Sequence, residues 1–81
     1  MTPYRVTVSG WTPLGSKGVT ARGSSFRCEA VSPSIAVHIA AERFFLLHPG
    51  FDEAYLRVRG MTFEASLVGH RIYVWHQRGE A

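Results

Sequence analysis

Short stretches in which apolar and polar residues alternate occupy most of this chain of 81 residues. Alternation with a period of two places apolar side chains on one side of an extended strand, as in a sheet with one buried face. The pattern predicts strands at residues 4–9, 26–30, 54–59, 62–68 and 71–77. Tight turns at Gly60-Met61 and Gly69-His70 join the last three, which makes those strands antiparallel neighbours.

One segment between the second and third strands follows a helical pattern instead. Ser32 and Pro33 open it, because serine is a favoured N-cap and proline is tolerated at the first helical position. Pro49 and Gly50 end it, so we expect a helix from about Pro33 to Leu47. At about 100° per residue, the side chains expected to meet the sheet are Ala36, Val37, Ala40, Phe44 and Leu47. Those expected on the polar side are Ser34, His38, Glu42 and Phe45.

The predicted order of elements is therefore β-β-α-β-β-β, and the predicted fold class is α+β. We expect an antiparallel five-stranded sheet with one helix packed on one face, since this two-layer arrangement buries the apolar side of both elements. The length predicts a single small domain over residues 1–81 with one thin core. Within it, the glycines and Pro13 predict a mobile connection over about residues 10–24.

The face of the sheet opposite the helix combines arginine with aromatic residues. The outward positions of the predicted strands are Arg5, Arg27, Tyr55, Arg57, Arg59, Thr62, Glu64, Arg71, Tyr73 and Trp75. Such a face suits single-stranded nucleic acid, because aromatic rings stack on bases while arginine neutralises phosphate. It equally suits a protein partner, or a wetted surface of ordinary cross-strand and cation–π pairs. We take its arginine and aromatic residues as candidate partner-binding residues.

Basic charge is concentrated near the start of the chain, where residues 1–28 contain four basic residues and no acidic one. Two of them, Lys17 and Arg22, fall in the glycine-rich connection and extend the candidate binding set as an arm toward an acidic partner or phosphate. Eight of the nine basic residues are arginine. Arginine suits planar recognition of phosphate or carboxylate, although a GC-rich genome produces the same bias.

The predicted helix carries more apolar surface than one contact with a sheet requires. Ile35, Ile39 and Leu46 form a second apolar strip beside the sheet-facing one. Surplus apolar surface on a small domain indicates a partner chain, so a homodimer through this strip is one interpretation. The other is that Trp11 and Leu14 of the glycine-rich connection fold over the strip and complete the core.

Candidate catalytic and metal-binding patterns are weak. The segment from Gly10 to Lys17 differs from a P-loop, because its serine precedes its lysine and no parallel sheet is predicted. The histidines lack the spacing of a zinc site, and Cys28 points into the core. We therefore predict no catalytic residue, no metal and no cofactor. A small ribonuclease using His70 and His76 around Arg71 is the weakest alternative.

No apolar run reaches the length that spans a bilayer, and the first residues lack the apolar stretch of a signal peptide. We therefore expect a soluble protein that acts in the cytoplasm of a host cell, without a membrane partner.

Three segments of the chain resemble a known group of proteins. They are the entry to the helix at residues 29–36, the segment 55–59 and the final aromatic strand 71–75. With the β-β-α-β-β-β order, they resemble small phage-encoded anti-CRISPR proteins over about residues 4–76. The resemblance implies a non-enzymatic inhibitor that docks on a host CRISPR surveillance complex or a similar nucleic-acid-handling ribonucleoprotein. A net charge of +3 departs from the acidic members that mimic DNA.

Our leading hypothesis is therefore a small interaction protein that blocks a host protein or ribonucleoprotein surface without catalysis. The alternative is a single-stranded nucleic-acid-binding domain that uses the arginine and aromatic face.

Overall fold

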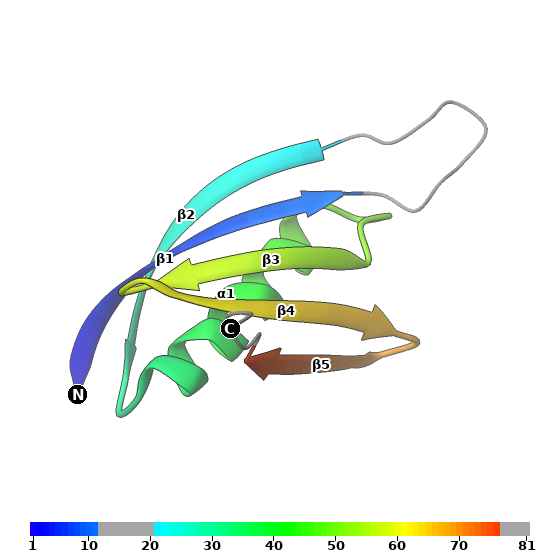
Figure 1. Cartoon of the computed structure of the whole chain (residues 1–81). Helices are drawn as coiled ribbons and strands as arrows, with labels where there is room; N and C mark the ends of the chain where they lie inside the picture. Colours follow the sequence, from blue (N-terminus) through cyan, green and yellow to red (C-terminus); the bar gives the residue numbers. More distant parts are fainter. Residues whose placement is uncertain (12–20, 77–81) are drawn as a thin grey trace, which may run out of the picture.

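The computed structural model describes residues 1–11 and 21–76. Five strands form one antiparallel sheet in the order β2-β1-β3-β4-β5, and a single helix lies across one face (Figure 1). The elements are β1 (Thr2–Trp11), β2 (Ala21–Ala30), α1 (Pro33–Leu47), β3 (Glu53–Val58), β4 (Met61–Val68) and β5 (Arg71–His76). The α+β class and the order β-β-α-β-β-β are confirmed. No helix within the described residues is long and apolar enough to cross a membrane.

The first two strands are longer than the sequence predicted. β1 continues through Gly10 to Trp11, and β2 begins at Ala21, because the β1–β2 ladder extends over all ten residues of each strand. The connection predicted at about 10–24 is thereby reduced to residues 12–20. These residues lie outside the described part of the chain, and so does the predicted mobility of the connection.

The helix begins and ends where the sequence predicted. The Ser32 side chain accepts a hydrogen bond from the Ile35 amide at 3.4 Å, which satisfies one free donor of the first turn. At the other end, the His48 amide donates to the Phe44 carbonyl, and Gly50 turns the chain at φ +97°. In a residue with a Cβ atom, that angle causes steric strain, so glycine suits this position.

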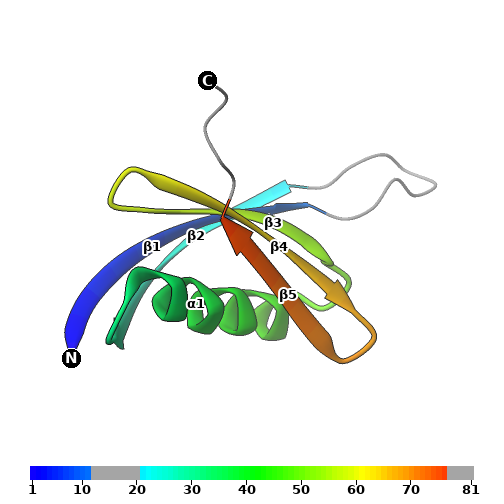
Figure 2. The same cartoon turned by 60° about the horizontal axis from the view of Figure 1, so that its bottom comes forward.

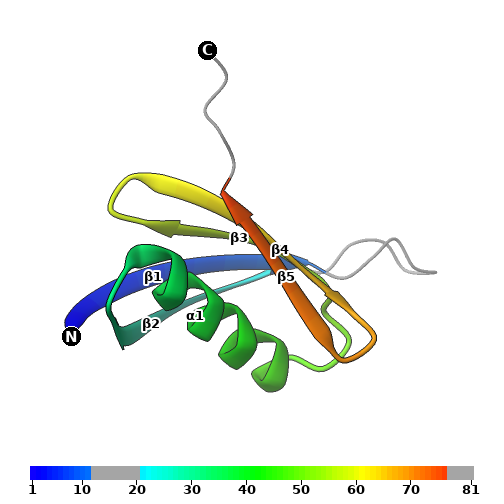
Figure 3. The same cartoon turned by 90° about the horizontal axis from the view of Figure 1, so that it is seen from below.

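The sheet twists strongly, so that β5, which pairs with β4 along its length, is inclined across α1 and contacts it (Figures 2 and 3). Two predictions about the helix are wrong. Phe45, expected on the polar side, is 6% exposed. Leu47, expected to meet the sheet, is 63% exposed because it ends the helix. Alternation within single strands does not report twist, so a helix enclosed on two sides was not foreseen.

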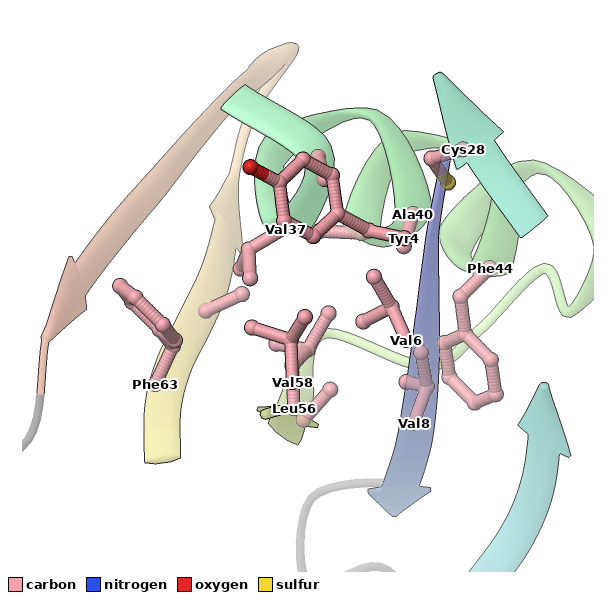
Figure 4. Close-up of a cluster of buried hydrophobic side chains, with 14 of the residues drawn as sticks. Tyr4, Val6, Val8, Cys28, Val37, Ala40, Phe44, Leu56, Val58 and Phe63 are labelled. Carbon is pink, nitrogen blue, oxygen red and sulfur yellow. The ribbon is translucent and has the colours of Figure 1, made fainter. Parts of the chain in front are cut away.

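The core lies between α1 and the inner face of the sheet, and it includes Cys28 of the edge strand β2 (Figure 4). Its largest fully buried side chains include Phe44 of the helix, Val6 and Val8 of β1, and Leu56 and Val58 of β3. Inward positions predicted from the alternation are buried in β1, in β3 and at two positions of β4. They are only half-buried in the edge strand β5, whereas Cys28 and Ala30 of the other edge strand, β2, are buried.

Gly10 lies where the helix packs closely against the sheet. A Cβ atom at this position would overlap the Phe44 ring and lie 3.2 Å from the Glu53 carbonyl oxygen. Both neighbours are fixed, since Phe44 is fully buried and Glu53 belongs to β3. The absence of a side chain at Gly10 is therefore what allows the aromatic ring to lie directly on the strand.

Gly10→Ala is expected to lower the free energy of unfolding by about 1–3 kcal/mol, the usual cost of overpacking a filled core. Gly23→Ala is the matched control, because its Cβ would lie 3.8 Å from the Val8 carbonyl oxygen, an ordinary contact. Urea denaturation measures both. If Phe44 is the obstacle, adding Phe44→Leu to Gly10→Ala costs less than the two single changes combined. Equal losses for the two glycine variants would contradict this account.

Candidate binding face

The outer face is defined here as the side of the sheet away from α1. Among the residues predicted to bind a partner, seven lie there with exposed side chains: Arg5, Arg27, Tyr55, Arg57, Arg71, Tyr73 and Trp75. The strand register determines which of them are neighbours.

Four aromatic residues occupy two adjacent rows across the outer face, and we call them the aromatic cluster. One row contains Tyr55 of β3 and Trp75 of β5, and the next contains Trp11 of β1 and Tyr73 of β5. The Trp11 and Tyr55 ring centroids are 5.0 Å apart with planes tilted by 47°, a favourable aromatic pair. Tyr73 and Trp75 remain 50% and 45% exposed.

Trp11 is the member that sequence reasoning missed. Its side chain belongs to the outer face because it continues the alternation of Arg5, Thr7 and Ser9 along β1. Treating Gly10 as the end of the strand concealed this continuity. The hypothesis that Trp11 covers the apolar strip of the helix is wrong, because Trp11 packs on Tyr55 on the opposite face.

Acidic residues lie within the same two rows. In the register, Glu64 stands between Tyr55 and Trp75, and Glu53 stands between Trp11 and Ser66. The Ser66 hydroxyl donates to a Glu53 carboxylate oxygen at 3.4 Å. The centre of the outer face therefore combines aromatic rings with carboxylates, and this distribution of charge distinguishes it from a uniformly basic surface.

A shallow recess opens beside the aromatic cluster. It has a volume of about 370 Å³ and is lined by Ser9, Tyr55, Arg57 and Thr62. Arg57 pairs with Thr7 and Thr62 in the register, so hydroxyl-bearing residues flank it on both sides. A guanidinium with neighbouring hydroxyl groups suits a carboxylate from a partner, because the group accepts several hydrogen bonds at once.

Of the remaining arginines of the outer face, Arg5 and Arg27 lie away from the aromatic cluster, whereas Arg71 adjoins it as the outward neighbour of Tyr73 along β5. Arg5 and Arg27 stand directly opposite each other where β1 and β2 extend beyond β3. Like charges in that arrangement destabilise a sheet and favour an anionic neighbour. Arg71 lies at the start of β5, near the Gly69-His70 turn. The structure therefore does not bring the predicted arginines into one patch.

Arg59 does not occupy the strand position that the sequence predicted. β3 ends at Val58, and Arg59 and Gly60 form the two-residue turn to β4 with φ values of +50° and +81°. The Arg59 guanidinium lies 4.6 Å from the centre of the Tyr4 ring, which is buried on the helix side of the sheet. The positive φ of Arg59 is the one that a two-residue hairpin turn requires at both of its central positions. We remove Arg59 from the candidate face.

Two further candidates fall outside what the structure describes. Lys17 lies in residues 12–20, and only the backbone of Arg22 is described, in β2 opposite Gly10. The proposed reaching arm stays a prediction.

The histidines of β5 and its turn do not form a compact site. The His76 ring packs against Phe63 at 4.8 Å, whereas His70 lies in the turn at the opposite end of the strand. Five steps of about 3.3 Å separate Arg71 from His76, or roughly 17 Å. One phosphodiester does not span that distance. Within residues 1–11 and 21–76, no three His, Cys, Asp or Glu side chains are grouped so as to hold a metal ion.

Comparison of the chain with family models, curated proteins and solved structures gave no significant match. The resemblance to anti-CRISPR proteins stays a prediction.

Cys28 is 1% exposed in the core, and burial raises the pKa of its thiol above the ordinary 9.0 while the positive charge of Arg43 opposes the shift. We expect no reaction with a thiol reagent at mildly alkaline pH until the protein unfolds. A Cys28→Ala, Ser25→Cys variant, whose thiol replaces an exposed serine, should react at once. Rapid labelling of native Cys28 would contradict its place in the core.

The raised pKa of Cys28 also determines how the stability of the fold depends on pH. Because the folded-state pKa lies above the unfolded one, the protonated thiol stabilises the fold fully below about pH 9. That stabilisation is lost as the pH rises through the folded-state pKa. In urea denaturation, the free energy of unfolding of the native protein should fall more steeply above pH 9 than that of the Cys28→Ala variant.

Proposed function

We propose that this protein is a non-catalytic interaction module that binds a protein surface through its outer face. The observation that carries the proposal is the aromatic cluster, in which Tyr55, Tyr73 and Trp75 expose 42–50% of their surface on a rigid sheet. Aromatic side chains held on strands lose little entropy on binding, and they dominate the energetics of protein interfaces.

The charges around the cluster favour a protein over a nucleic acid. Glu53 and Glu64 lie in the aromatic rows, where the phosphates that flank stacked bases would meet negative charge. Arg5 and Arg27 lie beyond β3, so they do not follow the rings as a basic track would. A protein partner with both acidic and basic side chains complements this pattern.

The recess at Arg57 adds a specific element to the proposed interface. An aspartate or glutamate of the partner fits between the Arg57 guanidinium and the Ser9 and Thr62 hydroxyl groups. In this arrangement the aromatic rings supply affinity, while the charged contact sets the orientation of the partner.

The identity of the partner is a further proposal, drawn from the sequence resemblance. We propose that the module is a phage-encoded inhibitor whose partner is a protein subunit of a host CRISPR surveillance complex. A basic protein does not imitate DNA, so inhibition on this hypothesis results from covering a protein surface that the complex needs.

A plasmid-challenge assay tests this identity in cells with an active CRISPR system. Expression of the protein should restore transformation by a targeted plasmid, and Trp75→Ala should abolish that effect. Unchanged interference across the major CRISPR types would contradict the anti-CRISPR assignment while leaving a different protein partner open to capture from lysate.

Trp75→Ala is expected to weaken binding to the captured partner by at least about 30-fold, the loss typical of an aromatic anchor. The free energy of unfolding should change by less than about 1 kcal/mol, because the ring is half exposed. Val31→Ala is the matched control, since Val31 is 69% exposed between β2 and α1, away from the outer face. Titration calorimetry and urea denaturation measure the two effects.

A fluorescent oligonucleotide titration at two salt concentrations separates the competing function. A single-stranded nucleic acid held by arginines loses affinity with a logarithmic slope of about 0.7 per neutralised phosphate. Tight binding with such a slope, reduced by Trp75→Ala, would overturn the proposal of a protein partner.

A further inference from the structure

Among the described residues, the β5 edge of the sheet lacks the sequence features that normally prevent pairing with another strand. Within Arg71–His76 there is no proline, glycine or lysine, and the only arginine stands at the first position. The opposite edge, β2, contains Gly23 and carries exposed Arg27 and Glu29 toward its end. An unprotected edge such as that of β5 is a template for pairing with another strand.

The register shows which backbone groups β5 leaves free. Val68 and Arg71 flank the two-residue turn, so they exchange hydrogen bonds, as do Tyr73 and Trp75 with their β4 partners. The Leu67 amide donates to the Asp52 carbonyl at 2.9 Å on the opposite side of β4, which agrees with this alternation. The amide and carbonyl groups of Ile72, Val74 and His76 therefore point away from the sheet.

We propose that β5 pairs with β5 of a second copy of this chain, antiparallel about a two-fold axis at Val74. In this register, Val74 pairs with Val74 of the second copy and Ile72 pairs with His76. All the free groups of the edge then exchange hydrogen bonds, and the two sheets become one continuous sheet. On the outer face, Tyr73 lies directly opposite Trp75 of the second copy, at the close spacing of a non-hydrogen-bonded pair.

The charge of β5 favours a second copy in the antiparallel sense. Arg71 is the only arginine or lysine of the strand, and the two-fold axis places the two Arg71 side chains at opposite ends of the interface. Each lies diagonally across from Trp75 of the other copy, within reach of a cation–π contact. Parallel pairing would bring the two like charges together.

The exposed rings of β5 supply part of the apolar surface that a specific interface needs. Tyr73 and Trp75, 50% and 45% exposed, each leave roughly 100 Å² uncovered, so the four rings of a dimer contribute on the order of 400 Å². A specific interface buries at least about 1,200 Å². The helix must therefore supply the remainder, and Ile35 and Leu46 are 46% and 76% exposed.

Two grooves between α1 and β5 show how the helix joins this interface. One groove, of about 420 Å³, places Ile35 and His38 beside Val74 and His76. The other, of about 250 Å³, places Leu46 beside Ile72. Because His76 faces Ile72 of the second copy, the two-fold axis brings Ile35 toward Leu46 of that copy. The apolar strip predicted from the sequence thus lies beside the strand edge, although Ile39 itself is half-buried against the core.

This inference does not depend on the proposed function. It does change the shape of the candidate face, because the aromatic cluster would continue across the two-fold axis into that of the second copy.

Sedimentation equilibrium over a range of concentrations tests the dimer. The expected mass approaches twice 9.0 kDa, and Val74→Pro should raise the dimer dissociation constant on the order of 30-fold, the loss expected for two amide hydrogen bonds. Proline at this position removes only a donor that points away from β4, so the monomer should stay folded. A mass of 9.0 kDa at every concentration would overturn the proposal, as would a Val74→Pro dimer of unchanged affinity.

A second pair of variants covers the case in which Val74→Pro does not fold. Tyr73→Lys places like charges near the two-fold axis and should dissociate the dimer, whereas Thr7→Lys on central strand β1 should not. Equal effects of the two lysines would contradict pairing at the β5 edge.

Disulfide trapping tests the register. Tyr73→Cys combined with Trp75→Cys should give a covalent dimer on oxidation, because the two positions face each other at a separation that a disulfide spans. The native Cys28 is buried and does not compete. Tyr73→Cys alone should not crosslink, and efficient crosslinking of that single variant would contradict the register.

Discussion

The packing of the Phe44 ring against the bare backbone of Gly10 connects the two layers of this protein. Phe44 is fully buried, and its ring also contacts the rings of Phe45, His48 and Phe51 near the end of the helix. The close approach brings α1 onto β1, the strand that lies beside both β2 and β3. With the helix held there, the sheet twists around it and buries Phe45 as well.

One consequence of this two-layer arrangement is that nearly all its exposed aromatic surface lies on the sheet. The helix covers one face, and the opposite face carries Trp11, Tyr55, Tyr73 and Trp75 without any covering element in the described residues. Rings placed in this way bury only part of their surface within the domain, and partial exposure of large rings disfavours solubility. Their arrangement in adjacent rows, with carboxylates between them, is the basis for proposing a protein partner.

The edge of the sheet and the outer face are physically linked through β5. Side chains alternate along this strand, so Tyr73 and Trp75 project to the outer face. The backbone amides of Ile72 and Val74 point outward from the open edge of the sheet. Pairing of two β5 strands would therefore leave the rings on the same face and join two aromatic clusters. On these two proposals, the free backbone groups of β5 serve self-association, while its rings contact both the second copy and the partner.

The sequence by itself determined the fold class, the helix from Pro33 to Leu47 and the inward side chains of the strands, because period-two alternation and capping residues act locally. It also placed Tyr55, Arg57, Tyr73 and Trp75 on the outer face. Only the tertiary structure decided that Trp11 joins Tyr55, that Arg59 turns back over Tyr4, and that Arg5 and Arg27 lie apart from the rings. These outcomes depend on register and twist, which arise from contacts between distant segments, and a single strand's pattern contains no information about either.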